Sequence, residues 1–424
     1  NAAQRIGTGL AWTAVFMALT GTFVRWYESH QIGPDIGHIP VSNLYEVFVL
    51  FCWMTALFYL YFEQQYRTRA LGAFVMLIVS AVVLLGFTLL GGLQSLSVSL
   101  IDLIGPGLGY QIGLIAAVTV ISSLIDLPFD YYKQFSLEEK FGFNKMTPGL
   151  FFSDLIKQTL VGAAIGLPLL WLTLTVMEKS GSLWWLYAWC ALVVYQLFVM
   201  WIAPNVIMPL FNKFTPLEDA SLKERVTALM TRAGFTAKGF FVMDGSRRSA
   251  HSNAFFTGFG AAKRVVFFDT LLAQLNGDEM EAVLAHELGH FKHRHILKMM
   301  ATSFAVSLAG LALLGWLSQQ VWFYTGLGVM PNLSGGNQAL ALLLFMLVLP
   351  LFTFFVSPLS ARRSRQFEFE ADAYAAANSN GQALGSALLK LYQDNASTLT
   401  PDPWYVAFYY SHPPASQRLA RINA

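Results

Sequence analysis

Charged residues are scarce in this sequence. Asp, Glu, Lys and Arg make up only 12% of its 424 residues, whereas a soluble globular protein carries about a quarter. The formal net charge of +2 supplies no strongly basic surface, so we expect no nucleic-acid partner. Hydrophobic residues reach 55% and gather in runs of membrane-spanning length. The lipid bilayer is therefore the expected surroundings of part of the chain.

Cysteine is also scarce, because the chain has only Cys52 and Cys190, which lie far apart in apolar runs. Two such residues exclude a disulfide framework, and we expect both to be small buried hydrophobes. The first apolar run begins near Leu10 and lacks a small-residue cleavage site after it. We therefore expect a retained span rather than a signal peptide.

Eight apolar runs are candidate membrane spans, each about 18 to 25 residues long. Lys and Arg gather in the loops after the second, fourth, sixth and eighth runs, and the opposite loops hold little beyond Arg25 and Lys179. The positive-inside rule then places these loops and both termini in the cytoplasm. The runs are Thr8–Trp26, Tyr45–Phe62, Ala70–Leu93, Leu108–Leu127, Leu155–Met177, Leu183–Ala203, Met299–Phe323 and Asn337–Val356.

Two stretches have the composition of soluble structure, residues 204–298 and 357–424. A helical hairpin separates them, so both lie on the same face of the membrane and can form one domain. We expect a helix at Ser221–Ala233 and strands at Gly239–Met243 and Arg264–Phe268. Asp278 is the expected cap of a further helix, with Glu279 and Glu281 in its first turn.

The expected organisation is mainly α. It comprises an N-terminal membrane region (1–83), further spans (84–203), a soluble domain in two parts (204–298 and 357–424), and a transmembrane hairpin between them (299–356).

The further helix carries His286-Glu287-Leu288-Gly289-His290, an H-E-x-x-H motif. Residues four apart share a helix face, so His286 and His290 can both bind one zinc ion. Glu287 lies beside them and can take a proton from a water molecule that zinc activates. The motif has only three fixed positions, so a helix with solvated His and Glu remains the alternative on the motif alone.

A third ligand is available about 80 positions downstream. Glu368 and Asp372 are four apart on a helix-like stretch, so Glu368 can bind zinc while Asp372 holds a ligating histidine by its other nitrogen. Glu370 points elsewhere on that helix. A metzincin site would need Gly at position 293 and His at position 296, but this chain has His293 and Ile296. We interpret His293 and His295 as structural residues at a basic helix end.

Several further blocks resemble the integral-membrane CAAX prenyl proteases of the pheromone-maturing type and their bacterial relatives. The resemblance runs from about Leu89 to the C-terminus. The blocks are residues 90–94 (LGGLQ), 128–132 (PFDYY), 139–145 (EKFGFNK), 249–258 (SAHSNAFFTG), 286–290 (HELGH), 367–372 (FEFEAD) and 411–414 (SHPP).

The resemblance implies a ring of helices around a large intramembrane chamber, with a cytoplasmic, gluzincin-like zinc protease domain that carries a small β-sheet. It implies His286, His290 and Glu368 as ligands and Glu287 as base and acid. It also implies that Asn253 and Ala254 lie on an edge strand that pairs with the substrate backbone. His412 would stabilise the oxyanion and Arg418 would support the site, although a lone His before two prolines is more often a turn residue.

Residues before about Val83 resemble instead the N-terminal region of haem-handling membrane proteins of cytochrome c biogenesis. The blocks are residues 26–30 (WYESH) and 39–46 (IPVSNLYE). We interpret this region as a fusion, and a divergent native N-terminus is the alternative.

The leading functional hypothesis is a zinc metalloendopeptidase of the bacterial inner membrane or an equivalent membrane. Its substrates would be membrane-associated or C-terminally prenylated proteins. The alternative function, haem handling in cytochrome c assembly, has only His30 and His38 near the spans.

Overall fold

The structure is a computed structural model of the whole chain. It describes residues 12–13, 15–17, 19–24, 27, 87–235, 239–257, 264–332, 335–395, 398 and 401–422. The chain divides into two compact units, residues 1–115 with 316–350, and residues 116–315 with 351–424. Both soluble stretches expected from the sequence belong to the second unit.

The first unit contains short apolar helices with buried polar links. Helix α4 (Gly92–Ile104) is 13 residues long and was not predicted. Its Ser97 hydroxyl lies 2.6 Å from the hydroxyl of Tyr110, at the start of α5 (Leu108–Tyr132). The Gln94 side chain accepts a hydrogen bond from the Met330 amide, just beyond α13 (Val321–Thr325). The Ser97–Tyr110 bond is buried and satisfies two polar groups among apolar side chains, where an unpaired group would be costly, whereas the Gln94–Met330 bond is exposed.

Four described helices are long and apolar enough to cross a membrane: α5 with η1 (Lys133–Glu138), α6 (Pro148–Lys179), α7 (Trp184–Ile202) with its flanking turns, and α12 (His295–Leu317). They confirm the fourth to seventh expected spans. The eighth lies in α14 (Gln338–Asn378), whose apolar part is Gln338–Pro350. The described residues from 12 to 24 are helical, as expected for the first span. The second span and most of the third lie outside the described residues.

Large apolar side chains cover the outside of these helices. Leu160 on α6, Trp201 on α7 (Trp184–Ile202) and Val306 on α12 are each more than 60% exposed. Such contiguous exposure is costly in water but favourable in lipid. Cys190 is also exposed on α7, so our prediction that it is buried was wrong. Cys52 lies outside the described residues.

A small mixed sheet supports the soluble part of the second unit. Its strand order is β1 (Phe214–Pro216), β2 (Gly239–Met243), β4 (Arg264–Phe268), β3 (Ala254–Thr257). The predicted strands are β2 and β4, which pair in parallel, while β1 and β3 pair antiparallel at the edges. Strand β1 has three residues and ends in proline, so it carried little signal in the sequence.

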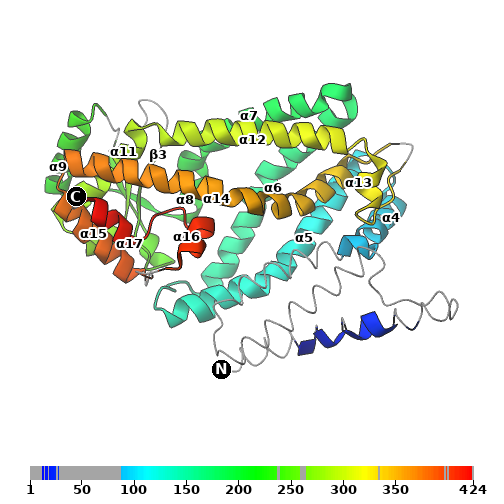
Figure 1. Cartoon of the computed structure of the whole chain (residues 1–424), viewed down its shortest axis with the longest axis horizontal. Helices are drawn as coiled ribbons and strands as arrows, with labels where there is room; N and C mark the ends of the chain where they lie inside the picture. Colours follow the sequence, from blue (N-terminus) through cyan, green and yellow to red (C-terminus); the bar gives the residue numbers. More distant parts are fainter. Residues whose placement is uncertain are drawn as a thin grey trace. The chain divides into compact units, whose positions relative to one another are not determined.

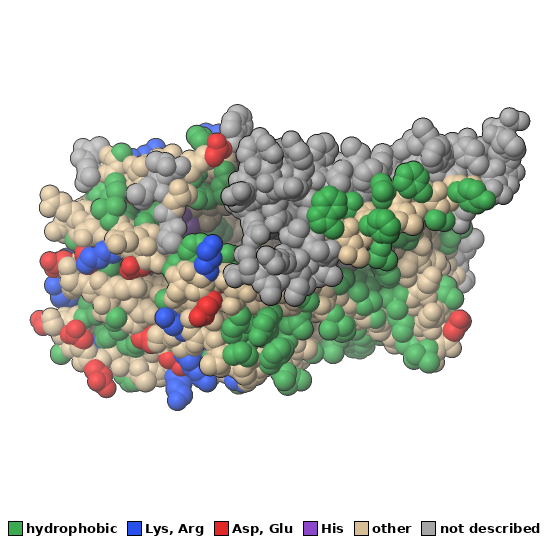
Figure 2. All heavy atoms as spheres, turned by 90° about the horizontal axis from the view of Figure 1, so that it is seen from below, with side chains coloured by type: hydrophobic (Ala, Val, Ile, Leu, Met, Phe, Trp, Pro, Cys, Tyr) green, Lys and Arg blue, Asp and Glu red, His purple; other side chains and the backbone are tan. Residues whose placement is uncertain are grey.

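Four helices pack around this sheet (Figure 1): α9 (Ala220–Arg232), α11 (Gly277–Lys292), α15 (Gly381–Asp394) and α17 (Ala415–Ile422). Their core includes Val226, Phe267 and Leu288, each fully buried. Helix α9 confirms the predicted helix to within one residue. In the view of Figure 2, acidic and basic side chains gather at this end of the molecule. The remaining short elements are η1 (Lys133–Glu138), η2 (Gly181–Leu183), η3 (Ala203–Ile207), α8 (Met208–Phe211), η4 (Gly245–Arg247), α10 (Asp269–Gln274) and α16 (Pro403–Tyr409).

The start of α11 differs from the prediction. Asn276, not Asp278, is the N-cap, and its side chain accepts hydrogen bonds from the amides of Asp278 and Glu279. The Glu279 carboxylate in turn accepts a hydrogen bond from the Asn276 amide and completes a capping box. Asp278 and Glu279 are the acidic residues of the first turn, so Glu281 lies beyond it.

Candidate metal centre and active site

Helix α11 brings the two histidines of the motif together. Its inner face is anchored by Ala282, Ala285 and Leu288, all fully buried. One helical turn separates His286 from His290, and their Nε2 atoms lie 3.1 Å apart. Two imidazole nitrogens this close are suited to share a metal ion.

A close approach of two helices supplies the third group. A Cβ atom added to Gly289 of α11 would meet the Ala371 Cα atom at 2.9 Å and the Ala371 carbonyl oxygen at 3.0 Å. Only glycine therefore lets α11 lie this near the backbone of α14. This contact places Glu368, one turn before Asp372 on α14, beside the two histidines.

Glu368 completes a set of three ligands. Its Oε2 atom lies 3.5 Å from His286 Nε2, and its Oε1 atom lies 3.4 Å from His290 Nε2. One ligand atom from each of the three residues lies within 4.8 Å of the other two. The Oε2 atom is buried without a hydrogen-bond partner in the described residues. A buried carboxylate oxygen facing two imidazoles fits a zinc ion in both donor type and number.

Asp372 and Arg418 form a second layer behind His286. The Asp372 carboxylate lies 2.9 Å from His286 Nδ1 and accepts two hydrogen bonds from Arg418, at 2.8 and 2.6 Å. Both side chains are buried, and Arg418 Nη1 also lies 3.5 Å from Glu368. Asp372 thus fixes the orientation of His286 and leaves its Nε2 for metal. The bidentate Arg418 holds Asp372 ionised inside the protein.

These carboxylates set the charge of the site. Burial works against a charged imidazole, but Asp372 and Glu368 outweigh it and raise the pKa of His286 to about 9. The site therefore attracts positive charge, which a zinc ion would supply in place of a proton. Burial raises the pKa of Glu287 above its ordinary range, although His286 and His290 oppose the shift. A raised pKa makes a carboxylate a better proton acceptor.

His412 joins the site from the C-terminal segment. Its Nε2 atom lies 3.4 Å from Glu368 Oε1, and its side chain is 64% exposed. The chain next to His412 is held by the Tyr392 hydroxyl, which donates a hydrogen bond to the Pro413 carbonyl at 2.8 Å. The sequence did not reveal this bond. An exposed imidazole beside the ligand set is in a position to contact a bound substrate.

His295 lies much deeper than our interpretation of a basic helix end suggested. It is fully buried, and its Nδ1 atom lies 3.0 Å from Nδ1 of His290. His293 is exposed, as expected for a helix end. Glu370 points away from the three ligands, as predicted, and toward His295.

Asn253 and Ala254 lie where an edge strand begins. Ala254 is the first residue of β3, which ends the sheet on one side, and its side chain is buried. The Asn253 carbonyl accepts a hydrogen bond from the Phe268 amide at 3.0 Å. Strand β3 is an edge strand among the described strands, and it packs against α11, the helix that carries the motif.

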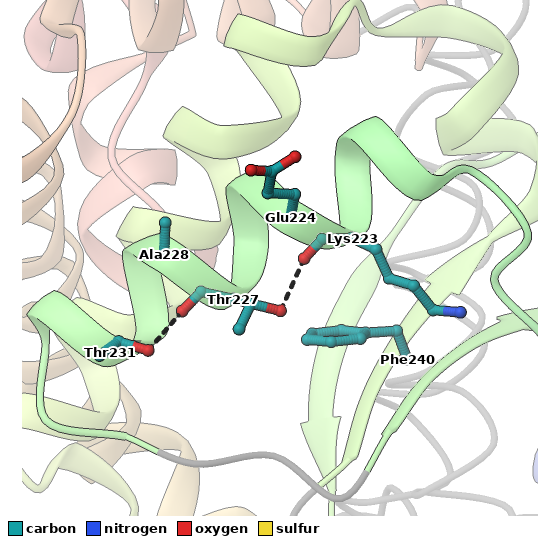
Figure 3. A pocket seen from close by; sticks show the side chains of 6 residues that line it. All are labelled: Lys223, Glu224, Thr227, Ala228, Thr231 and Phe240. Carbon is teal, nitrogen blue, oxygen red and sulfur yellow. Dashed lines mark hydrogen bonds between the residues drawn. The ribbon is translucent and has the colours of Figure 1, made fainter.

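A surface pocket on α9 is unrelated to this site. It is lined by Lys223, Glu224, Thr227, Ala228, Thr231 and Phe240 (Figure 3). The two threonine hydroxyls donate to carbonyls of their own helix, at 2.7 and 2.8 Å. The pocket shares no residue with the three metal ligands, which lie on α11 and α14.

Comparison with known proteins agrees with this geometry. Residues 63–213 match the family described as the CAAX prenyl protease N-terminal region with five membrane helices, and residues 216–424 match peptidase family M48. CAAX prenyl protease 1 of Saccharomyces cerevisiae is 38% identical over 347 residues, 77% of each chain. The chain belongs to the CAAX prenyl protease 1 family of M48 zinc metallopeptidases.

Further relatives show the breadth of this family. The CAAX prenyl protease 1 homolog of Homo sapiens is 34% identical over 345 residues, 72% of each chain. The crystal structure of S. mikatae Ste24p matches with a TM-score of 0.75 and 30% identity, covering 98% of both chains. The expected mainly helical membrane fold and the zinc cofactor are thereby confirmed.

The family assignment also revises one expectation. The match begins at residue 63, whereas we expected it to begin near residue 89. It favours the integral-membrane peptidase over haem handling for residues 63–424. The boundary at residue 83, the fusion hypothesis and the intramembrane chamber stay predictions.

Proposed function

We propose that this membrane metallopeptidase is an endopeptidase whose zinc ion is held by His286, His290 and Glu368. The observation that carries the proposal is the convergence of these three groups beside Glu287, whose pKa is raised by burial. Bound zinc would lower the pKa of water and polarise a peptide carbonyl.

The protein groups divide the remaining work. Glu287 takes the proton of the attacking water and returns it to the leaving amine, as a general base and then a general acid. His412 donates to the oxyanion as the carbonyl carbon becomes tetrahedral. Asp372 and Arg418 keep His286 in the tautomer that binds metal.

The edge of β3 is the proposed binding surface for the substrate backbone. An extended peptide can add to the free edge beside Asn253 and Ala254, with main-chain hydrogen bonds that tolerate many sequences. The relatives are named as CAAX prenyl proteases, which favours C-terminally prenylated or other membrane-associated proteins as substrates. The basic loops favour an active site on the cytoplasmic side, and we propose a bacterial inner membrane or its equivalent as the location.

The test uses purified full-length protein in detergent. Zinc per chain is measured, and cleavage of one peptide is followed in farnesylated and unfarnesylated form. We expect one zinc, cleavage by wild type, and loss of cleavage in Glu287→Gln, with Glu224→Gln on the exposed face of α9 as the matched control. Zinc-loaded protein that cleaves neither peptide would reject the endopeptidase proposal, and equal cleavage of both would reject a requirement for the prenyl group.

A further inference from the structure

His295 is held from three sides next to the metal centre. Its Nδ1 atom lies 3.0 Å from His290 Nδ1, and its Nε2 atom lies 2.9 Å from Glu370 Oε2. The Phe367 ring stacks on the imidazole, with centroids 4.1 Å apart and planes 9° apart. Both polar atoms of this fully buried ring are therefore used, and the ring has little freedom to turn.

One proton arrangement satisfies every contact. His290 Nε2 faces Glu368 and His286, so a metal at that point needs the Nε2 lone pair and leaves the His290 proton on Nδ1. That N–H must donate to His295 Nδ1, which can accept only if it carries no proton. The His295 proton then lies on Nε2 and donates to Glu370. Two neutral imidazoles and one carboxylate complete the chain without an unpaired group.

We propose that His295 and Glu370 are positioning residues for His290. They orient His290 as Asp372 orients His286. The inference rests on the proposed zinc site. Metal-ligating histidines are usually oriented by a carboxylate or other acceptor at the second nitrogen, and loss of that acceptor weakens metal binding by about 10- to 100-fold. Here the carboxylate acts through a second imidazole. The Gln366 side chain donates a hydrogen bond to the other oxygen of the Glu370 carboxylate, at 3.0 Å, and so holds this carboxylate in place.

A second metal site is the competing interpretation of the same residues. His293, His295 and Glu370 also place three possible ligand atoms within 4.8 Å of one another. Both His295 nitrogens are already paired, however, and binding a metal there would break the bond to His290 or to Glu370. The observations favour the hydrogen-bonded chain, and metal stoichiometry separates the two interpretations.

The experiment measures zinc release from purified full-length protein into excess chelator. His295→Leu keeps an apolar filling against Phe367 but removes both hydrogen bonds, and we expect zinc release about 10- to 100-fold faster. His295→Asn places an oxygen near the Nδ1 position, so it should recover part of the loss. Glu370→Ala should give a smaller acceleration, and His293→Ala, its exposed neighbour, should match wild type.

Cobalt substitution provides a second measurement that is independent of activity. The absorption of bound cobalt reports ligand geometry, so His295→Leu should change the spectrum while His293→Ala should not.

Three outcomes would overturn the inference. The first is zinc release at the wild-type rate in both His295→Asn and Glu370→Ala when these variants are folded. This outcome can be tested even if His295→Leu does not fold. The second is equal acceleration in His293→Ala. The third is two zinc ions per wild-type chain with one lost in His293→Ala, which would assign a second metal site instead. Wild type that binds no zinc would reject the proposed function itself.

Discussion

Replacing Gly289 with alanine tests whether the approach of α11 and α14 builds the metal centre. The added Cβ atom would lie 2.9 Å from the Ala371 Cα atom, 3.0 Å from its carbonyl oxygen and 3.1 Å from the Tyr374 Cβ atom. Non-bonded carbon atoms settle at about 3.5–4.0 Å, so α14 must move away by roughly 0.5–1 Å. Backbone atoms form most of the obstacle, and a side-chain rotation cannot relieve it.

The magnitude follows from that displacement. Overpacking of this kind costs about 1–3 kcal/mol of stability. Metal-ligand distances tolerate only about 0.2 Å, so Glu368 would move out of range of a zinc ion on His286 and His290. We therefore expect Gly289→Ala to fold with a lower unfolding temperature and to lose most of its zinc.

The assay measures zinc per chain and thermal unfolding side by side. Gly310→Ala on α12 is the matched control, because a Cβ atom there meets nothing within 4 Å in the described structure. Alanine in a helix interior is favoured over glycine by about 1 kcal/mol, so the control should be as stable as wild type or more so. If Gly289→Ala retained zinc and stability like Gly310→Ala, the helix contact would not determine the geometry of the site.

Three further perturbations address other parts of the site. Glu287→Gln should keep zinc and lose cleavage by about 10²- to 10⁴-fold, and near wild-type turnover would reject Glu287 as the base. Tyr392→Phe removes the bond that holds the His412 turn, so turnover should fall by about three- to tenfold with zinc retained; unchanged kinetics would contradict this role. Burial raises the pKa of Glu279, but hydrogen bonds, above all from Lys390, outweigh it and lower the pKa below its ordinary value of 4.5. The stability from this carboxylate is therefore present above that value and lost as the pH falls. Glu279→Gln should destabilise the protein by about 1–3 kcal/mol at pH 7 and by progressively less below about pH 4.5, as unfolding curves would show; a difference independent of pH would refute the account.

The ligand set could be predicted from the sequence because it depends on the spacing of residues that are close together along the chain. The four-residue spacing of His286 and His290 fixes a shared face on any helix, and Glu368 with Asp372 repeats that spacing. What joins the two faces is long-range packing. The Gly289 contact with α14 depends on the path of the chain between them, which periodicity does not contain. The spacing of Glu368 and Asp372 made Glu368 available as a third ligand, and the family resemblance implied the same assignment, but neither contains the contact between the two helices.

The failures also have particular causes. His295 follows Lys292, His293 and Arg294, so its sequence neighbours indicate an exposed end, yet the backbone turns sharply there and Arg294 adopts a φ of 55°. The turn sends His295 into the core and leaves His293 outside. The sequence also offered Asp278 as the cap of α11, but Asn276 forms the capping box with Glu279.

Helix α14 links the membrane to the chemistry. It runs without interruption over 41 residues, from the shorter apolar part Gln338–Pro350 to the carboxylates of the site. Glu368, Glu370 and Asp372 all project from its last three turns, one to the metal position, one to His295 and one to His286. A rotation or shift of this helix would therefore change all three contacts at once. The two histidines, by contrast, belong to α11, which begins and ends within the soluble part. The metal centre thus forms between two helices of different character, one that continues from an apolar segment and one that lies within the core of the peptidase domain, and its geometry depends on the packing between them.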